Sequence, residues 1–166
     1  RGIVGDHGFM ADYFTSPAEF LVTVPPALAE LGFLVEPISI TEKAVEHADA
    51  SRSAFEWHPD SALVLGNGSL GLLTLAMFEQ RFDRTYCLGR RERPDPTIDI
   101  IESLDSTYVN SNETAVPEIP DAYEAPDLIY ESTGYAKHPF ESIEALAPNG
   151  VLAALGIPGD WAFEIE

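Results

Sequence analysis

The sequence has few positive charges and almost no cysteine. Its 166 residues include nine Lys and Arg against 28 Asp and Glu, which gives a formal net charge of −19. This charge repels nucleic-acid phosphates and disfavours anionic membrane surfaces, so we expect neither as a partner. The single cysteine, Cys87, excludes a disulfide framework and a cysteine zinc cluster. We expect it to be a small buried apolar residue in a strand.

The sequence also lacks a run of about 18 apolar residues and a signal peptide, so we predict a cytoplasmic location. Its hydrophobic content of 45% still indicates a folded domain. Only two of the basic residues are lysines, Lys43 and Lys137. An acidic, lysine-poor surface is typical of proteins in multimolar salt, where screening removes charge repulsion. We favour such a halophilic protein over an ordinary acidic one, and this predicts unfolding in dilute buffer.

A glycine-rich segment follows an apolar run near the middle of the chain. Residues 61–65 are apolar on both faces, which predicts a central parallel strand, and an apolar helix is predicted from Leu70 to about Arg81. The turn between them lets backbone amides and a helix N-terminus approach a pyrophosphate. The residues of this candidate site are Gly66, Asn67, Gly68, Ser69, Leu70 and Gly71. One alternative is that the glycines only permit tight helix packing. A methyltransferase loop is the other, but it usually has an acidic residue after the first strand, and none is present.

Two arginines follow the second predicted strand, residues 85–88, in the segment Gly89-Arg90-Arg91. An acidic residue about 20 positions after the glycine turn would bind the ribose hydroxyls of NAD. Guanidinium groups there instead favour the 2′-phosphate of NADP, with Gly89 leaving room for it. The alternative is an ordinary solvated turn. Glu92 and Asp95 come slightly late for the ribose, and they keep NAD possible.

The remaining pattern predicts an α/β fold with a doubly wound parallel sheet, the Rossmann fold. The predicted strands are residues 62–65, 85–88, 107–110, 127–131 and 151–155. A sixth strand should lie beyond Glu166, and a start without methionine suggests a piece of a longer polypeptide. We divide the chain into residues 1–35, with strands near 9–14 and 20–24, a connecting helical region at 36–60, and the nucleotide domain at 61–166. Within 36–60 we expect a helix from Thr41, as its N-cap, to about His47.

Several segments, in order, resemble the zinc-dependent medium-chain dehydrogenases. They are HGFMADYF (7–14), FLVTVP (20–25), EPISITEKA (36–44), VLGNGSLG (64–71), GRRE (89–92), ESTG (131–134) and NGVLAALG (149–156). Within that family the chain is most similar to the archaeal glucose 1-dehydrogenases. The resemblance implies that residues 1–35 are the end of a GroES-like catalytic domain and that the protein forms a homodimer or homotetramer.

The same resemblance implies a zinc- and NADP-dependent oxidation of D-glucose to gluconolactone. Glu36 would bind the metal or its water and contact the sugar, while the other zinc ligands would precede Arg1. A surface glutamate is the alternative for Glu36. Ser132, Thr133 and Gly134 follow the fourth predicted strand, at the edge where such sheets bind ligands. We expect them to border the nicotinamide half of the cofactor.

The histidines show no metal-binding spacing, and we interpret His7, His47, His58 and His138 as structural or surface residues. Two other functions stay open. One is a polyol or alcohol dehydrogenase of the same family, and the other is a non-catalytic NADPH-binding module. In either case we predict that residues 1–166 alone bind nucleotide at best and oxidise no sugar.

Overall fold

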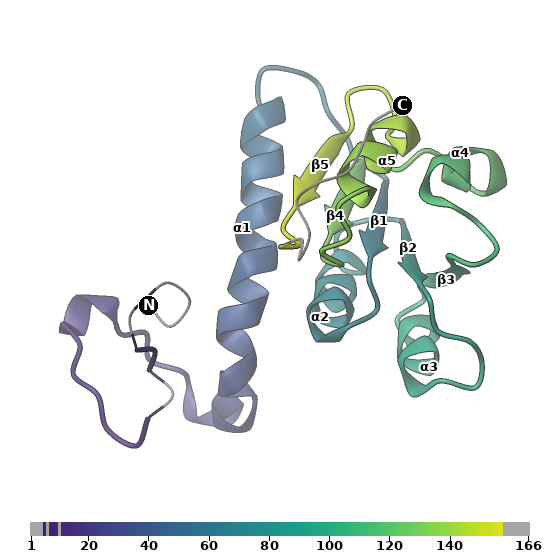
Figure 1. The fold of residues 1–166 in the computed structure, drawn as a ribbon. Coiled ribbons are helices and arrows are strands. Elements are labelled where there is room, and N and C mark those ends of the chain that lie inside the picture. Colours follow the sequence, from purple (N-terminus) through teal and green to yellow (C-terminus); the bar gives the residue numbers. More distant parts are fainter. Residues whose placement is uncertain (1–4, 6, 10, 158–166) are drawn as a thin grey trace. The chain divides into compact units, whose positions relative to one another are not determined.

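A computed structural model describes residue 5, residues 7–9 and residues 11–157. Its centre is one parallel sheet with the strand order β3-β2-β1-β4-β5 (Figure 1). The strands are β1 (Ser61–Leu65), β2 (Arg84–Gly89), β3 (Thr107–Asn110), β4 (Leu128–Glu131) and β5 (Val151–Ala154). The order reverses direction at β1, so the predicted doubly wound sheet is confirmed, with all five strands within two residues of the predicted bounds.

Helices cover both faces of this sheet. They are α1 (Val35–Arg52), α2 (Ser69–Phe78), α3 (Pro96–Ser103), α4 (Ile119–Ala122) and α5 (His138–Ala145), with 3₁₀ turns η1 (Ala18–Phe20), η2 (Pro26–Leu34) and η3 (Val116–Glu118). Buried side chains of α1, α2 and α3 pack in one cluster, and those of η3, α4 and α5 pack in another. Within the described ranges, no helix has the length and apolar character needed to cross a membrane.

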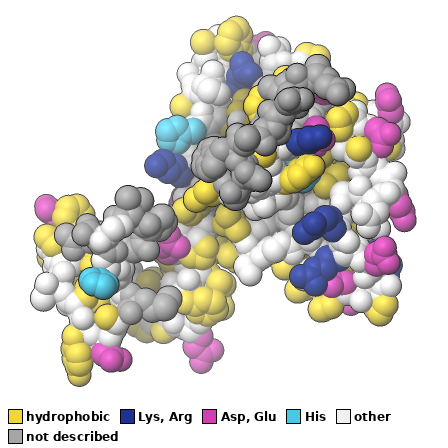
Figure 2. Space-filling view, in the orientation of Figure 1, with side chains coloured by type: hydrophobic (Ala, Val, Ile, Leu, Met, Phe, Trp, Pro, Cys, Tyr) yellow, Lys and Arg dark blue, Asp and Glu magenta, His cyan; other side chains and the backbone are white. Residues whose placement is uncertain are grey.

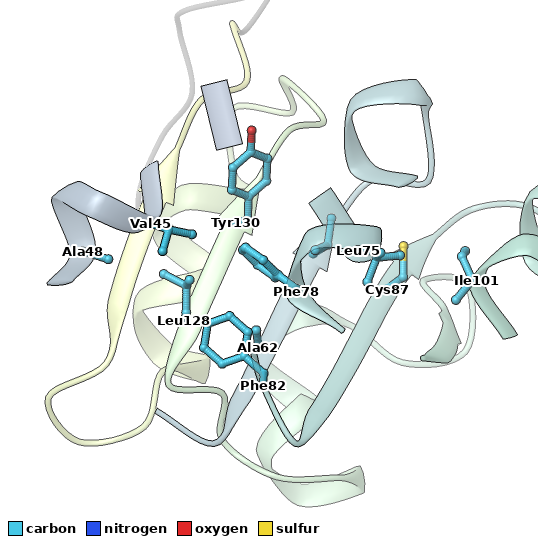
Figure 3. Packing of buried hydrophobic residues seen from close by; sticks show 11 residues of the cluster. Val45, Ala48, Ala62, Leu75, Phe78, Phe82, Cys87, Ile101, Leu128 and Tyr130 are labelled. Atoms are coloured by element: carbon cyan, nitrogen blue, oxygen red, sulfur yellow. The ribbon is translucent and has the colours of Figure 1, made fainter. Parts of the chain in front are cut away.

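The side chains of β1 point alternately to the two faces, and all five of its residues are buried. Ala62 and Val64 contribute to the cluster of α1 and α2, which also contains Phe78 and Tyr130 (Figure 3). Leu63 and Leu65 contribute to the opposite cluster. Burial on both faces explains why this strand reads as an uninterrupted apolar run. Cys87 belongs to the first cluster, which confirms the expectation of a buried cysteine.

Residues 1–35 form a separate compact unit. The strands that we predicted near 9–14 and 20–24 are wrong for the residues described there, which have irregular backbone apart from Phe20 at the end of η1. No described residue of this unit is buried, so the alternating apolar side chains have no face to pack against within it. Pro17, Pro25 and Pro26 further remove the amides that a strand ladder would need. Assignment of this unit to a GroES-like domain stays a prediction.

Helix α1 begins earlier and ends later than we predicted. Thr41 lies inside the helix rather than at its N-cap, and it is fully buried, with its Oγ1 2.8 Å from Oγ1 of Thr74. Pro37 falls in the first turn of α1, where a missing amide proton costs no helical hydrogen bond. The pattern Glu36-Pro37 therefore opens a helix.

Candidate nucleotide-binding site

The predicted site residues converge at the carboxyl edge of the sheet, because β1 lies between β2 and β4. Leu65, the last residue of β1, pairs with Leu88 on one side and with Glu131 on the other. The Gly66 amide donates to the Leu88 carbonyl at 2.8 Å, and the Ser132 amide donates to the Leu65 carbonyl at 3.1 Å. The segments after β1, β2 and β4 therefore begin side by side.

The three glycines of the turn after β1 have different physical roles. Gly66 has a φ of +108°, a backbone conformation that residues with a side chain rarely adopt. A Cβ at this position would also come within 3.1 Å of Cγ2 of Thr133. A Cβ on Gly71 would lie 1.8 Å from the Gly66 carbonyl oxygen, so only glycine allows helix α2 to approach the turn. Gly68, in contrast, has no atom within 4 Å of where its Cβ would be. The open side of the turn is therefore at Gly68.

Helix α2 starts at this open position with Gly68 as its N-cap, and no side chain caps it. The first amides of the helix and its dipole consequently remain available to an anion. Ser69 is exposed there. Leu70 is half-buried and packs against the core cluster, so its side chain serves packing and only its backbone belongs to the turn.

Asn67 connects the turn after β1 to helix α3. Its Nδ2 donates to Oγ1 of Thr97 at 2.8 Å. A Cβ on Gly89 would lie 2.7 Å from the Asn67 carboxamide, so Gly89 makes room for Asn67. The expectation that Gly89 also leaves room for a phosphate stays a prediction.

Helix α3 was missed in the sequence analysis, although Asp95 and Pro96 carry a helix-start signal. Asp95 is its N-cap and accepts from the Thr97 amide at 2.9 Å and from the Thr97 hydroxyl at 2.5 Å. These hydrogen bonds from Thr97, with a smaller contribution from Arg91, lower the pKa of the Asp95 carboxyl. Asp95 is thus occupied as a cap, which leaves it poorly placed to bind the ribose of NAD.

The two arginines after β2 differ in their partners. Arg91 donates to Asp95 at 3.2 Å, and its carbonyl accepts from the Tyr108 hydroxyl at 2.7 Å. Arg90 is exposed and forms no hydrogen bond or ion pair with the residues that the structure describes. On the face drawn in Figure 2, the few basic side chains of the α/β unit (dark blue) lie among acidic ones (magenta). Arg90 is therefore the guanidinium that can turn to a phosphate without first breaking an ion pair.

A buried carboxylate organises the loop after β4, and the sequence analysis assigned it no role beyond the strand. Glu131 is only 1% exposed. Its Oε1 accepts from the Thr133 amide at 2.7 Å, the Thr133 hydroxyl at 2.5 Å and the Gly134 amide at 3.1 Å, and its Oε2 accepts from the Gly156 amide at 3.2 Å. Ser132 faces the other way and donates its hydroxyl to the Leu65 carbonyl at 2.9 Å. A charged residue at the end of an otherwise apolar strand was the available signal.

The residues that the structure describes do not assemble a zinc site. Glu36 is exposed in the first turn of α1, and its carbonyl accepts from the Ser39 hydroxyl at 2.6 Å. The described residues include no group of three or more His, Cys, Asp or Glu side chains that could hold a metal ion. Cys87 is enclosed in the core cluster, and burial raises the pKa of its thiol to about 12. Glu36 as a zinc ligand stays a prediction.

The sheet order and the turn between β1 and α2 define a doubly wound α/β domain of the Rossmann type. A family model described as "Glucose dehydrogenase C-terminus" matches residues 29–166, and the chain belongs to this family. It is 68% identical over 168 residues to glucose 1-dehydrogenase 1 of Haloterrigena turkmenica, covering 100% of this chain and 46% of the relative. Identity to glucose 1-dehydrogenase of Haloarcula marismortui is also 68%, covering 100% of this chain and 47% of that protein. The chain therefore spans about half the length of these curated relatives.

Solved structures give the same result. The glucose dehydrogenase of Haloferax mediterranei in complex with NADP, Zn and gluconolactone has a TM-score of 0.95 and 65% identity, over 100% of this chain and 47% of that chain. The alcohol dehydrogenase TADH from Thermus sp. ATN1 has a TM-score of 0.64 at 19% identity, over 78% of this chain and 36% of that chain, which shows the fold alone. The close relatives come from halophilic archaea, in agreement with the acidic, lysine-poor composition.

Proposed function

We propose that the full-length protein oxidises D-glucose to glucono-1,5-lactone with NADP⁺, and that the present chain provides the cofactor-binding half. The observation that carries this proposal is the 0.95 TM-score, over the whole chain, to a relative that was solved with NADP, Zn and gluconolactone. Two features of this chain suit such a cofactor: the open turn at Gly68, and the exposed Arg90, which forms no ion pair with a described residue.

The reaction breaks the C1–H bond of the sugar and passes the hydride to the nicotinamide ring, which is the chemistry that NADP⁺ supplies when bound. The anomeric hydroxyl loses its proton, and C1 becomes the lactone carbonyl carbon. The contribution of this chain is to position the cofactor. The backbone amides at the start of α2 would bind the pyrophosphate, with Gly66 and Gly71 fixing the turn and Gly68 leaving it open.

Preference for NADP⁺ over NAD⁺ would come from the segment after β2. Arg90 would hold the 2′-phosphate, since a guanidinium binds phosphate through paired hydrogen bonds. Arg91 would contribute less, because it is already bonded to Asp95. We further propose that the Ser132–Gly134 segment borders the bound dinucleotide, because its amide at Ser132 is bonded to β1 beside the turn.

Zinc dependence rests on the relative rather than on the residues of this chain. The described residues contain no group of three or more side chains that could hold a metal ion, and Glu36 is the one residue of this chain that the family resemblance assigns to the zinc. We therefore propose zinc binding, and contact of Glu36 with zinc and sugar, only for the full-length protein. A cytoplasmic location and a homodimer or homotetramer belong to the same proposal.

The test is steady-state oxidation of D-glucose by the full-length protein in multimolar KCl, with NADP⁺ and NAD⁺ side by side and a chelator control. We expect chelator-sensitive turnover that prefers NADP⁺. Turnover of a polyol or simple alcohol in place of glucose would favour another dehydrogenase of the family. Tight NADPH binding without turnover of any of these substrates would favour a non-catalytic module. Detectable sugar oxidation by residues 1–166 alone would contradict the assignment of this chain to the cofactor half.

A further inference from the structure

The loop after β4 joins a buried carboxylate to a histidine ring. Oγ1 of Thr133 lies 2.5 Å from Oε1 of Glu131 and 2.8 Å from Nδ1 of His138. The Tyr135 amide donates to the same Oγ1 at 3.0 Å, and the Tyr135 ring packs edge-on against the His138 ring at 4.9 Å. These contacts hold the imidazole from two sides at the start of α5.

The hydrogen-bond network assigns the tautomer of this histidine. A hydroxyl has one proton to donate and two lone pairs that accept. The Thr133 proton goes to Glu131, because an ionised carboxylate can only accept. The Thr133 lone pairs then accept from the Tyr135 amide and from His138, so Nδ1 of the neutral imidazole carries the proton. Nε2 must be the acceptor nitrogen.

This acceptor nitrogen has no partner of its own. Nε2 of His138 forms no hydrogen bond with the described residues, and it is not among the buried polar atoms that lack one. Glu131 is buried, whereas Thr133 and Tyr135 are exposed and His138 is half-buried. The network therefore runs from a buried carboxylate to the surface, and it leaves Nε2 at its outer end, where a donor from outside can reach it.

The position of the ring indicates which donor it would meet. The loop lies against the glycine turn, since a Cβ on Gly66 would approach Cγ2 of Thr133 to 3.1 Å. The positive charge of Arg90, in the segment after β2, also acts on the His138 ring. Arg90 and His138 therefore lie near the same part of the proposed site. Because the 2′-phosphate and the 3′-hydroxyl of NADP⁺ are on adjacent carbons of one ribose, a ring near Arg90 would meet the 3′-hydroxyl.

We propose that Glu131 and Thr133 are positioning residues that fix His138, so that its Nε2 accepts a hydrogen bond from the 3′-hydroxyl of the adenosine ribose of NADP⁺. This inference rests on the proposed cofactor site and deepens it. It replaces our interpretation of His138 as a structural or surface residue. It also places Thr133 on the adenosine half of the cofactor, acting through His138, rather than on the nicotinamide half.

The first test is a nitrogen-15 NMR spectrum of the histidines of the full-length protein in multimolar KCl. We expect the Nδ1–H tautomer for His138 in the free protein and a change in the Nε2 shift when 2′,5′-ADP is added. An Nε2–H tautomer, or an Nε2 shift that 2′,5′-ADP leaves unchanged while it binds, would overturn the proposal. This measurement needs no variant, so it is independent of any folding defect.

The second test is calorimetric binding of two fragments, 2′,5′-ADP and nicotinamide mononucleotide. His138→Phe should weaken 2′,5′-ADP binding about tenfold and leave the mononucleotide unchanged. His138→Gln should recover part of this loss, because its amide oxygen can accept in place of Nε2. Thr133→Val should lower the affinity for 2′,5′-ADP about threefold, and the His138 ring should then populate both neutral tautomers. The matched control His58→Phe, at an exposed histidine before β1, should change neither affinity.

Equal affinities of wild type and His138→Phe for 2′,5′-ADP would overturn the proposal, as would a loss confined to the mononucleotide. If the folded wild-type protein binds neither 2′,5′-ADP nor NADP⁺, the cofactor site itself is refuted and this inference with it.

Discussion

The turn after β1 and the loop after β4 lie at the same edge of the sheet, but different interactions hold their shapes. The turn depends on side chains that are missing, since a Cβ on Gly71 would lie 1.8 Å from a carbonyl oxygen. The loop depends on one side chain that is present, the buried Glu131, which accepts four hydrogen bonds. Close backbone packing thus shapes the turn after β1, and hydrogen bonds to a buried carboxylate shape the neighbouring loop after β4.

The difference predicts how each part fails. A clash with backbone atoms can be removed only by moving the backbone, so the turn should tolerate no side chain at Gly71. A polar network fails by degrees, according to how many buried donors lose their acceptor.

The largest expected effect is that of Gly71→Val, because helix α2 cannot approach the turn with a side chain at this position. We expect no cooperatively folded protein, or a loss of more than about 4 kcal/mol in the free energy of unfolding. Denaturant titration in multimolar KCl measures this loss. Gly68→Ala is the matched control, since its side chain would meet open space. It should cost no more than about 1 kcal/mol as an N-cap change, and still weaken NADP⁺ binding.

A smaller loss should follow from Glu131→Gln. The amide keeps the shape but turns one acceptor oxygen into a donor that faces backbone N–H groups. We expect about 2 to 3 kcal/mol of destabilisation by the same titration. Glu144→Gln, at an exposed position on α5, should stay within about 0.5 kcal/mol of wild type. Equal effects of both substitutions would show that Glu131 does not organise the loop.

The segment after β2 extends the comparison to two adjacent arginines. Arg90→Ala should weaken NADP⁺ binding about tenfold without changing the affinity for NAD⁺, because it removes from the proposed 2′-phosphate site a guanidinium that no described residue pairs with. Arg91→Ala should lower the affinity for NADP⁺ only about threefold, because the Arg91 guanidinium already donates a hydrogen bond to Asp95. Calorimetric titration with each cofactor distinguishes the two. A larger loss for Arg91→Ala, or an equal loss for NADP⁺ and NAD⁺, would reverse these assignments.

The smallest effect concerns pH. Burial lowers the pKa of His138 below its ordinary value of 6.5, with help from Arg90 and against the opposing charges of Glu141 and Glu131. The unfolded chain therefore binds more protons near this pH, and stability should fall as the pH drops through 6.5. His138→Gln should flatten this part of the curve of unfolding free energy against pH. An unchanged curve would show that His138 is not shielded in the folded protein.

The fold could be predicted largely because its central strands are buried on both faces. Such strands appear in the sequence as apolar runs, and β1 (Ser61–Leu65), which is buried at every position, was predicted at residues 62–65. The strands predicted within residues 1–35 were wrong for the opposite reason. All described residues of this unit are at least partly exposed, so its alternating apolar residues do not correspond to a buried face within the unit. Helix α3 escaped notice because Asp95 was considered as a ribose ligand rather than as a cap.

The candidate site could be predicted only where local geometry constrains residue type. Positive φ and close approach restrict Gly66 and Gly71 to glycine, so they were visible in the sequence. The loop conformation brings together Glu131, Thr133 and His138. No sequence motif with a fixed spacing predicts this contact. The role of Gly89 was also out of reach, since it depends on where the Asn67 side chain lies.

The most direct test is a crystal structure of the full-length protein with NADP⁺, grown from multimolar KCl. We predict the pyrophosphate at the amino end of α2 beside Gly68, and the 2′-phosphate within hydrogen-bonding distance of Arg90. Phosphates bound away from the carboxyl edge of β1 and β2, or a 2′-phosphate that contacts neither Arg90 nor Arg91, would contradict the proposed cofactor site.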